Sequence, residues 1–358
     1  MDQVSITDEA AKLASEFTIP HELGFGKILA PVMIVCDYKK GEWGKMTMLP
    51  YGPISMDPCS KVLHYGQEIF EGLKAYNSGG QGARLFRPDQ NAERFNHSAR
   101  RMAMPELPTK MFYHAVSSIA QICEHFIPKR SGESLYIRPF MFASEEFLGI
   151  RPSQSFKFMV VASPSARYFE EDGLKVFIER KKARACIGGT GNAKTGGNYA
   201  ASLLSANEAL EHGYAQTLWL DARTHSTIEE MSGMNFFAVK QGVLFTPKLH
   251  ETILAGITRD SLISIALDLG IEVREETMKI EELIQDIKTG KVTELFACGT
   301  AVIVTPISLL GEIDGTHYPV TAPKGPVARK LKEHLLGIQE GRIHGPISWS
   351  VSCSQTRQ

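Results

Sequence analysis

Apolar residues recur along the chain in two patterns, and each pattern predicts one kind of secondary structure. Continuous apolar runs rich in β-branched and aromatic residues predict buried strands, whereas apolar residues at helical spacing predict amphipathic helices. Strands are expected at 29–35, 83–86, 135–142, 156–162, 174–179, 216–220, 236–239, 243–246, 272–275 and 293–297, and helices at 88–102, 113–126, 199–212, 258–269 and 281–287. The two kinds interleave and Gln241-Gly242 marks a hairpin, so an α+β fold is favoured over a doubly wound sheet.

The chain of 358 residues is long enough for two domains, because domains typically hold ~100–200 residues. The apolar pattern breaks down at 163–173, where Pro164, Gly173 and three acidic residues occur together. Such a stretch is typical of a linker. We therefore expect a smaller N-terminal domain at 1–165, a linker at 166–174 and a larger C-terminal domain at 175–358.

The charge balance excludes some classes of partner. The 39 basic and 40 acidic residues leave a formal net charge of -1 without a long run of like charge, so nucleic acid is not an expected partner. The apolar stretch at 28–36 is interrupted by Pro31 and is well short of the ~20 residues that span a bilayer. No membrane partner is expected either.

The first residues and the cysteines favour a cytoplasmic protein without a metal. Residues 1–17 carry four acidic residues and the first arginine is Arg84, whereas secretory and mitochondrial signals are basic. The six cysteines include no CxxC pair, which argues against a zinc site and against a disulfide framework.

The densest chemical signal is a glycine-rich segment at 188–199 with Lys194 at its centre. Five glycines within ten positions indicate backbone that approaches a ligand closely. The lysine could be a Schiff-base nucleophile, a phosphate clamp or a solvated loop charge. The spacing fits a nucleotide-binding P-loop except at its second glycine, where Ala193 stands, and Gly196-Gly197 is expected to prevent the helix that a P-loop requires after its lysine. A nucleotide hydrolase is therefore a remote alternative.

A Schiff-base cofactor with a pyridine ring needs an acidic partner for its ring nitrogen and donors for its phosphate. Glu229-Glu230 supplies acids just before a strand, although one of the two is expected to be an exposed loop residue. Gly256, Ile257 and Thr258 open a predicted helix, where free backbone N–H groups can bind phosphate. Taken alone, that segment is simply a helix start.

These segments together resemble one family across nearly the whole chain. The matching segments are 63–76, 85–88, 136–139, 192–199, 230–235 and 299–301. The chain is similar to branched-chain amino-acid aminotransferases, which are fold-type IV enzymes that use pyridoxal 5′-phosphate. The resemblance implies a two-domain, D-amino-acid aminotransferase-like fold with the cofactor at the domain interface and with the C-terminal domain binding it.

The resemblance also implies the cofactor contacts. Lys194 would form the Schiff base, Glu230 would face the pyridine nitrogen, and Tyr199 would bond the phenolic oxygen. The phosphate contacts implied are Arg94, the amides of Ile257 and Thr258, and Thr300. Composition alone would instead treat Arg94 as an ordinary surface arginine.

Substrate contacts are implied in the same way. An apolar wall suited to leucine, isoleucine and valine is implied at Tyr65, Phe70, Tyr136 and Tyr168, although aromatic residues more often belong to a core. Arg138 is implied to receive the distal carboxylate of glutamate. The amides of Thr300 and Ala301 are implied to hold the α-carboxylate.

The implied activity is reversible transamination of branched-chain amino acids with 2-oxoglutarate, which gives branched-chain 2-oxo acids and glutamate by a ping-pong mechanism. A homodimer is also implied, in which residues of one subunit complete the other's pocket. D-Amino-acid aminotransferases and aminodeoxychorismate lyases share the lysine and the glutamate, but 136–138 and 196–199 favour the branched-chain assignment. The mammalian CxxC motif is replaced by Val302 and Thr305, so thiol regulation of that kind is not expected.

Overall fold

The computed structural model describes residues 3–77, 82–166 and 173–353. Its contacts divide the chain into two compact units. Unit 1 comprises Met1–Tyr168, Ala193–Gly196 and Leu336–Gln358, and unit 2 comprises Phe169–Asn192 and Gly197–Leu335. The main division lies inside the linker expected at 166–174, most of which is outside the described residues.

The units differ from the expected domains in two short segments, 193–196 and 336–358, which belong to unit 1. Backbone pairing explains the second of them, because Ser350–Ser352 forms a strand antiparallel to Ala83–Phe86. Such pairing joins residues far apart in the sequence, so a linear division of the chain does not show it.

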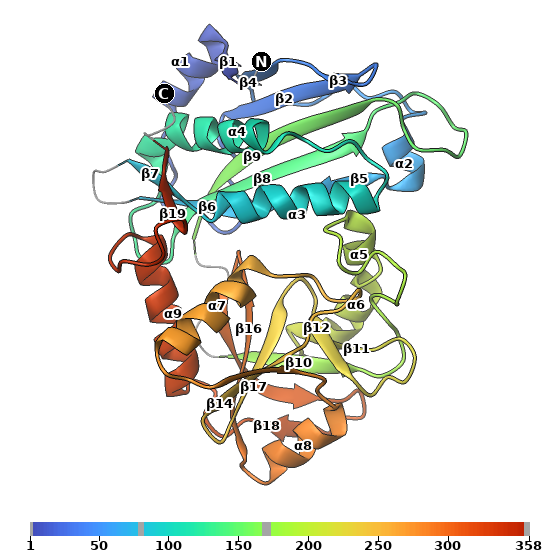
Figure 1. Ribbon diagram of the computed structural model, residues 1–358, viewed down its shortest axis with the longest axis vertical. Coiled ribbons are helices and arrows are strands. Elements are labelled where there is room, and N and C mark those ends of the chain that lie inside the picture. The colour runs from blue at the N-terminus through green and yellow to red at the C-terminus, as the bar shows by residue number, and fades with distance from the viewer. Residues whose placement is uncertain (1–2, 78–81, 167–172, 354–358) are drawn as a thin grey trace. The chain divides into compact units, whose positions relative to one another are not determined.

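Unit 1 is built on one sheet covered by helices (Figure 1). Its strands are β1 (Val4–Ile6), β2 (Val32–Lys39), β3 (Glu42–Trp43), β4 (Met46–Pro50), β5 (Glu68–Phe70), β6 (Leu73–Asn77), β7 (Ala83–Phe86), β8 (Ser134–Ala143), β9 (Phe156–Ser165) and β19 (Ser350–Ser352). They follow the order β1-β4-β2-β9-β8-β6-β7-β19, with β3 beside β2 and β5 beside β8. The helices are α1 (Asp8–Glu16), α2 (Lys61–Tyr65), α3 (Pro88–Arg101) and α4 (Thr109–Ile122).

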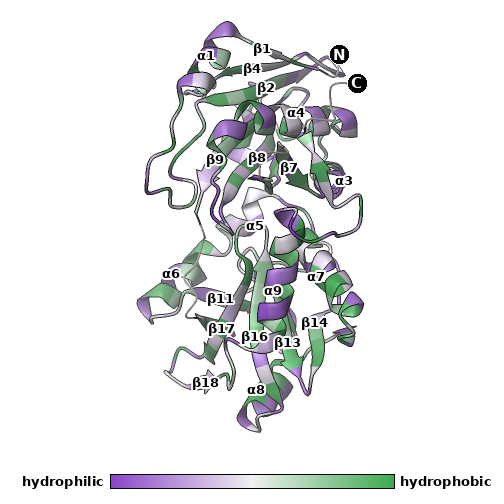
Figure 2. Cartoon of the chain, turned by 90° about the vertical axis from the view of Figure 1, so that its left-hand side faces the viewer, coloured by the Kyte–Doolittle hydropathy of each residue, from purple (hydrophilic) through white to green (hydrophobic). Residues whose placement is uncertain are grey.

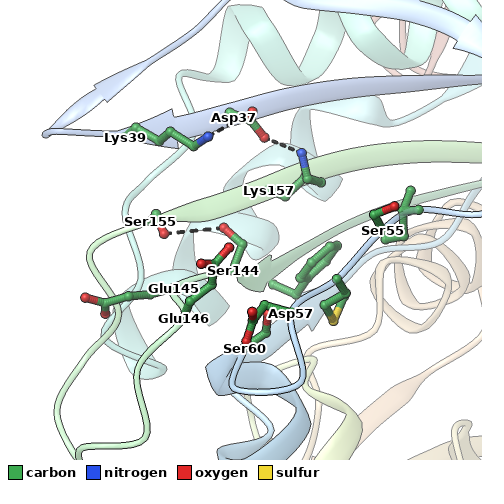
Figure 3. A pocket seen from close by; sticks show the side chains of 13 residues that line it. Asp37, Lys39, Ser55, Asp57, Ser60, Ser144, Glu145, Glu146, Ser155 and Lys157 are labelled. Atoms are coloured by element: carbon green, nitrogen blue, oxygen red, sulfur yellow. Dashed lines mark hydrogen bonds and ion pairs between the residues drawn. The ribbon is translucent and has the colours of Figure 1, made fainter.

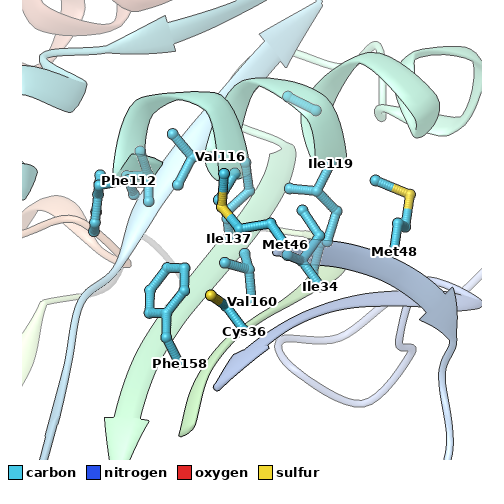
Figure 4. Close-up of a cluster of buried hydrophobic side chains, with 14 of the residues drawn as sticks. Ile34, Cys36, Met46, Met48, Phe112, Val116, Ile119, Ile137, Phe158 and Val160 are labelled. Atoms are coloured by element: carbon cyan, nitrogen blue, oxygen red, sulfur yellow. The ribbon is translucent and has the colours of Figure 1, made fainter. Parts of the chain in front are cut away.

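The unit 1 core lies between α4 and the long antiparallel strands (Figure 4). Phe112, Val116 and Ile119 recur at helical spacing on α4 and are fully buried. They face Ile137 of β8 and Phe158 of β9, which are fully buried too. The helix begins earlier than the expected 113–126, directly after Pro108, and a 3-10 turn at Glu124–Phe126 follows it.

Unit 2 contains the second sheet. Its strands are β10 (Leu174–Glu179), β11 (Gln216–Leu220), β12 (Ile228–Met231), β13 (Asn235–Lys240), β14 (Val243–Pro247), β15 (Val273–Glu276), β16 (Val292–Gly299), β17 (Ile303–Gly311) and β18 (His317–Pro319). They follow the order β12-β11-β10-β17-β16-β13-β14-β15, with β18 beside β17. Gln241 and Gly242 both have positive φ (51° and 83°), so the hairpin expected there is confirmed. Hydrophobic colouring extends over β13 and β14 in Figure 2.

The remaining helices are α5 (Gly196–Ala200), α6 (Leu203–Glu211), α7 (Ile257–Asp268), α8 (Ile280–Lys288) and α9 (Pro326–Gln339). The prediction of one continuous helix at 199–212 is therefore wrong, because α5 and α6 are separate helices. Strand β17 and helix α9 were not among the expected elements. Pro306 interrupts the apolar run of β17, but the buried Ala328, Leu331 and Leu335 of α9 do follow helical spacing.

In the part of the chain that the structure describes, no helix combines the length and apolarity needed to cross a membrane. The same residues contain no group of three or more His, Cys, Asp or Glu side chains arranged to hold a metal ion.

Candidate active site

Lys194 is fixed by its backbone within unit 1. Its N–H donates to the Ser98 hydroxyl (2.9 Å), and its carbonyl accepts from the N–H of Phe70 (3.0 Å). The ammonium nitrogen lies 4.8 Å from the centroid of the Phe70 ring. These contacts explain why residues 193–196 belong to unit 1.

Glu68 holds the residues that follow the lysine. The Thr195 hydroxyl donates to the carbonyl of Glu68 (2.8 Å), and the Gly196 N–H donates to its carboxylate. A side chain at Gly196 would overlap that carboxylate, so the close approach requires glycine. Burial raises the pKa of Glu68, and the Gly196 N–H and the Thr195 hydroxyl, which also donates to the carboxylate (3.4 Å), partly offset this effect. The Lys194 backbone is thus restrained on both sides.

Three of the expected substrate residues project from one face of the unit 1 sheet. Tyr136 and Arg138 are two positions apart on β8 and therefore share one face of the sheet. Phe70 of β5 pairs with Phe140, which lies on the same face. The Arg138 guanidinium donates to the Tyr136 hydroxyl (2.9 Å) and lies 4.7 Å from the Phe70 ring centroid. Its Nε is buried without a hydrogen-bond partner in the described chain. Lys194 joins this cluster through Phe70.

Gly72 gives Tyr136 the room it needs, because a Cβ at this position would overlap the tyrosine hydroxyl. Of the other two expected aromatic residues, Tyr65 makes its hydrogen bond outside this cluster. Tyr65 is 43% exposed and donates to the carbonyl of Leu148, and Tyr168 lies outside the described residues.

Arg94 is not the surface arginine that composition suggests, because its side chain is only 10% exposed. It donates from Nε and Nη2 to the two carboxylate oxygens of Glu71 (2.7 and 2.9 Å). Glu71 is fully buried and also accepts from Asn91 (2.7 Å). Burial alone would raise the pKa of Glu71, but Arg94 and these hydrogen bonds hold it below its ordinary value. The pair fixes the direction of the guanidinium.

Unit 2 buries both acids of β12, so the expectation that one of them is an exposed loop residue is wrong. Glu230 accepts from the Nη2 of Arg184 (2.6 Å), from Asn235 (3.2 Å) and from the N–H of Leu254 (3.3 Å). Glu229 accepts from the Thr252 hydroxyl at one oxygen, and its other oxygen has no hydrogen-bond partner in the described chain. Burial raises the pKa of Glu229 to about 7.

Replacing Glu229 with glutamine should change how stability depends on pH. The folded-state pKa is above the ordinary value of 4.5, so the native carboxyl disfavours folding as pH rises from about 4.5 to 7. Above pH 7 the free energy of unfolding of Glu229→Gln should exceed that of the native protein by about 1–2 kcal/mol, discounted for solvent screening. Urea unfolding across this pH range measures the difference. Parallel pH curves, or an equal change in the exposed control Glu211→Gln, would contradict the prediction.

The residues just before α7 are linked to Glu230 by hydrogen bonds. Asn235 donates to Glu230 and to the carbonyl of Leu254 (3.0 Å), and its amide oxygen packs so closely on Gly256 that a Cβ there would overlap it. Ile257 and Thr258 follow as the first buried residues of α7. The helix start expected from the sequence is confirmed.

Three expected residues lie elsewhere in unit 2. Tyr199 is half-buried on α5, and a Cβ at Gly233 would lie 3.5 Å from its ring. Thr300 and Ala301 form the half-buried turn between β16 and β17. The residues around Lys194, Arg94 and Arg138 thus belong to unit 1, and those around Glu230 and the start of α7 belong to unit 2.

Several contacting residues were not expected from the sequence. Glu68 and Glu71 lie inside the segment 63–76 that carries the resemblance, so two acids within a family motif were an available signal. Arg184 offered none, since it closes a basic stretch at 180–184 that is typical of a solvated surface.

The unit 1 sheet also borders a polar cavity of about 410 Å³ (Figure 3). It is lined by charged and hydroxyl-bearing side chains, and the ion pair of Lys157 with Asp37 spans part of it. None of the described residues that were expected in the active site lines this cavity.

The glycine-rich segment does not have the architecture of a P-loop. Helix α5 begins at Gly196, so the expectation that the glycines prevent a helix there is wrong. However, β10 ends at Glu179 and residues 180–195, all of them described, contain no strand directly before the lysine. The strand that a P-loop requires is missing.

The fold and the two residue sets define a class IV aminotransferase. The family model described as amino-transferase class IV matches residues 68–310, and the chain belongs to this family. It is 43% identical over 336 residues to branched-chain-amino-acid transaminase 1 of Bacillus subtilis, covering 93% of this chain and 94% of that protein. The family expected from the sequence is confirmed.

Solved structures give the same result. The branched-chain aminotransferase of Thermoproteus uzoniensis, solved with norvaline, has a TM-score of 0.75 and 28% identity, covering 90% of this chain and 99% of that chain. The branched-chain aminotransferase of Escherichia coli has a TM-score of 0.73 and 29% identity, covering 90% of this chain and 100% of that chain. The expected α+β, fold-type IV fold is confirmed.

Proposed function

We propose that the protein is a pyridoxal 5′-phosphate-dependent aminotransferase that transfers the amino group of leucine, isoleucine or valine to 2-oxoglutarate in a reversible ping-pong reaction. The observation that carries this proposal is the placement of Lys194 in a class IV aminotransferase. Its N–H and its carbonyl are both hydrogen-bonded, and its ammonium lies over the ring of Phe70, which Arg138 also contacts.

The described residues fit this cofactor chemically. Glu230 offers a buried, ion-paired carboxylate to a protonated ring nitrogen, and the first turn of α7 has N–H groups without intrahelical partners for a phosphate. Ile257 and Thr258 would bind the phosphate with Arg94 and Thr300, and Tyr199 would bond the phenolic oxygen. When bound, the cofactor supplies the electron sink that stabilises a carbanion at the α-carbon of the substrate.

The protein's own groups then have distinct tasks. Lys194 would remove the proton from the α-carbon of the amino acid and return it to the carbon that takes over the amino group. An amine held in one place can serve as base and then as acid. Phe70 and Tyr136 offer an apolar and aromatic surface to an aliphatic side chain. Thr300 and Ala301 would hold the α-carboxylate with their amides, while Tyr65 and Tyr168 remain candidates for the same pocket.

An absorbance spectrum of the purified protein, taken before and after borohydride reduction, tests the cofactor assignment. We expect a yellow protein whose reduced adduct maps to the peptide that contains Lys194. A protein that stays colourless and unlabelled after incubation with pyridoxal phosphate would contradict the assignment. Assays with D-amino acids and with aminodeoxychorismate distinguish the two related activities of the same fold.

Arg138 should matter more for glutamate than for leucine, because its buried Nε has no hydrogen-bond partner in the described chain and a distal carboxylate would supply one. In Arg138→Met we expect kcat/KM to fall by about 100-fold for glutamate and by less than about tenfold for leucine, as the loss of a charge-assisted hydrogen bond implies. Arg100→Met, which alters an exposed arginine, is the control. Equal losses for the two substrates would refute the role.

We also propose that the protein is a homodimer that associates through an apolar patch formed by Tyr65, Phe147, Leu148 and Ile150. These side chains are exposed in the single chain, Ile150 by 89%. The hydroxyl of Tyr65 donates to the carbonyl of Leu148, which ties α2 to the rest of the patch. Contiguous apolar exposure of this kind favours a protein interface.

Light scattering after size-exclusion chromatography tests the dimer. Ile150→Glu should shift the protein toward monomer, whereas Ile347→Glu, at another exposed isoleucine of unit 1, should not. A monomeric native protein would refute the proposal. A cytoplasmic location is proposed as well, supported by Cys36, Cys59, Cys123, Cys186 and Cys298, which form no disulfide among the described residues.

A further inference from the structure

Arg184 is a buried cation to which the proposed chemistry assigns no task. Its side chain is 7% exposed, whereas that of Arg180, four residues earlier, is 31% exposed and pairs with the exposed Glu281 and the half-buried Glu312. Besides Glu230, Arg184 donates to the carbonyl of Thr252. Its Nε is buried and has no hydrogen-bond partner among the described residues. A buried arginine directed at a carboxylate suggests a task other than solubility.

One guanidinium serves two buried acids here. Glu229 and Glu230 are 2% and 4% exposed, and the contact of Arg184 at 2.6 Å is with Glu230. Among the described residues, the hydrogen bond that Glu229 accepts comes from the neutral hydroxyl of Thr252. Burial raises the pKa of Glu229 to about 7, although the Thr252 hydroxyl and the nearby charge of Arg184 offset part of this effect. The direct ion pair of Arg184 is therefore with Glu230, while its charge also acts on Glu229.

The direction of the Glu230 carboxylate is also fixed. Arg184 binds Oε1, while Asn235 and the N–H of Leu254 bind Oε2. Asn235 in turn bonds the carbonyl of Leu254. Of these three donors, Arg184 is the charged one. Its positive charge therefore favours the ionised form of Glu230 over the protonated form.

We propose that Arg184 is a positioning residue for transamination, which keeps Glu230 ionised and aligned as the partner of the cofactor's ring nitrogen. The proposal rests on the proposed function and adds a residue to its machinery. Without Arg184, Glu230 accepts a proton more readily, and the ring nitrogen loses its anionic partner. The loss should appear in kcat more than in KM, because the electron sink is used in the chemical step.

A double-mutant cycle on the holoenzyme tests this directly. We expect Arg184→Met to lower kcat by about 100-fold in the native background but by no more than about twofold in Glu230→Gln, because the second variant has already removed the charge that Arg184 controls. The pH at which the visible absorbance of the bound cofactor changes should also shift by about one unit or more in Arg184→Met. Arg180→Met, at the neighbouring surface arginine, should change neither quantity.

Arg184→Lys distinguishes a loss of the positive charge from a failure to fold. A lysine retains the positive charge, so it should restore part of kcat and return the absorbance titration toward the native one. If Arg184→Met does not fold, as judged by circular dichroism of the apoprotein, Arg184→Lys and Arg184→Gln form the comparison instead. Identical titrations in the lysine and glutamine variants would overturn the proposal.

Losses of equal size in the native and Glu230→Gln backgrounds, or an unshifted absorbance titration, would also overturn the proposal and leave Arg184 with a structural role only. That result differs from failure of the proposed function. If the native protein neither carries a reducible adduct at Lys194 nor transaminates leucine, the proposed function itself is refuted.

Discussion

Lys194→Ala is expected to lower kcat for leucine by more than ~10³-fold, because no other amine would then bind the cofactor covalently and move the α-proton. The variant should fold normally. The contacts that fix this segment come from the backbone and from Glu68, and they do not involve the lysine side chain. A coupled assay for glutamate formation measures turnover, and circular dichroism checks the fold.

Two controls sharpen this result. Lys181→Ala alters an exposed lysine of the basic stretch and should leave turnover unchanged. Lys194→Arg keeps the positive charge but offers no nucleophilic amine at neutral pH, so it should be as inactive as the alanine variant. Turnover above a tenth of the native value in Lys194→Ala would show that another residue performs the transfer.

Glu71→Ala is expected to reduce the free energy of unfolding by about 3–5 kcal/mol, since it leaves the Arg94 guanidinium buried without its carboxylate. Urea unfolding monitored by tryptophan fluorescence measures the change. The pair should also make stability sensitive to acid. Because Arg94 lowers the pKa of Glu71, its contribution is present above the ordinary pKa of 4.5 and is lost as pH falls through the lower folded-state value.

The double variant Glu71→Leu with Arg94→Leu removes both charges and should recover most of that loss, because no ion then remains unpaired. Glu106→Ala breaks an exposed pair with Arg100 and should cost less than about 1 kcal/mol. A Glu71→Ala variant as stable as Glu106→Ala would show that solvent reaches Arg94 when its partner is removed.

The sequence predicted strands best where burial is simplest. The expected 174–179 and 216–220 match β10 and β11 to the residue, because both have an apolar centre, at 176–178 and 218–220. It failed at β12, where two adjacent acids concealed a buried strand. Hydrophobic patterning counts a glutamate as polar, and a tertiary partner such as Arg184, far away in the sequence, is what permits its burial.

The site shows the same limit. Motifs indicated Lys194, Glu230 and Arg138, because short segments of these residue types are specific to the family. The pairing of Arg94 with Glu71 depends on how α3 packs after β6 and β7, which local propensity does not encode. Segment 193–196 likewise joins unit 1 through Ser98 and Phe70, whereas its neighbours on both sides belong to unit 2.

The late strand β19 has a consequence for synthesis on the ribosome. It pairs with β7, and in the same region the carbonyl of Trp349 accepts from the N–H of Arg87 (2.8 Å). Translation delivers all of unit 2 before this strand, so β7 remains an open sheet edge while most of the chain is made. An open edge is a template for pairing with other chains. The β7 edge therefore stays open to such pairing until residues 350–352 have been made.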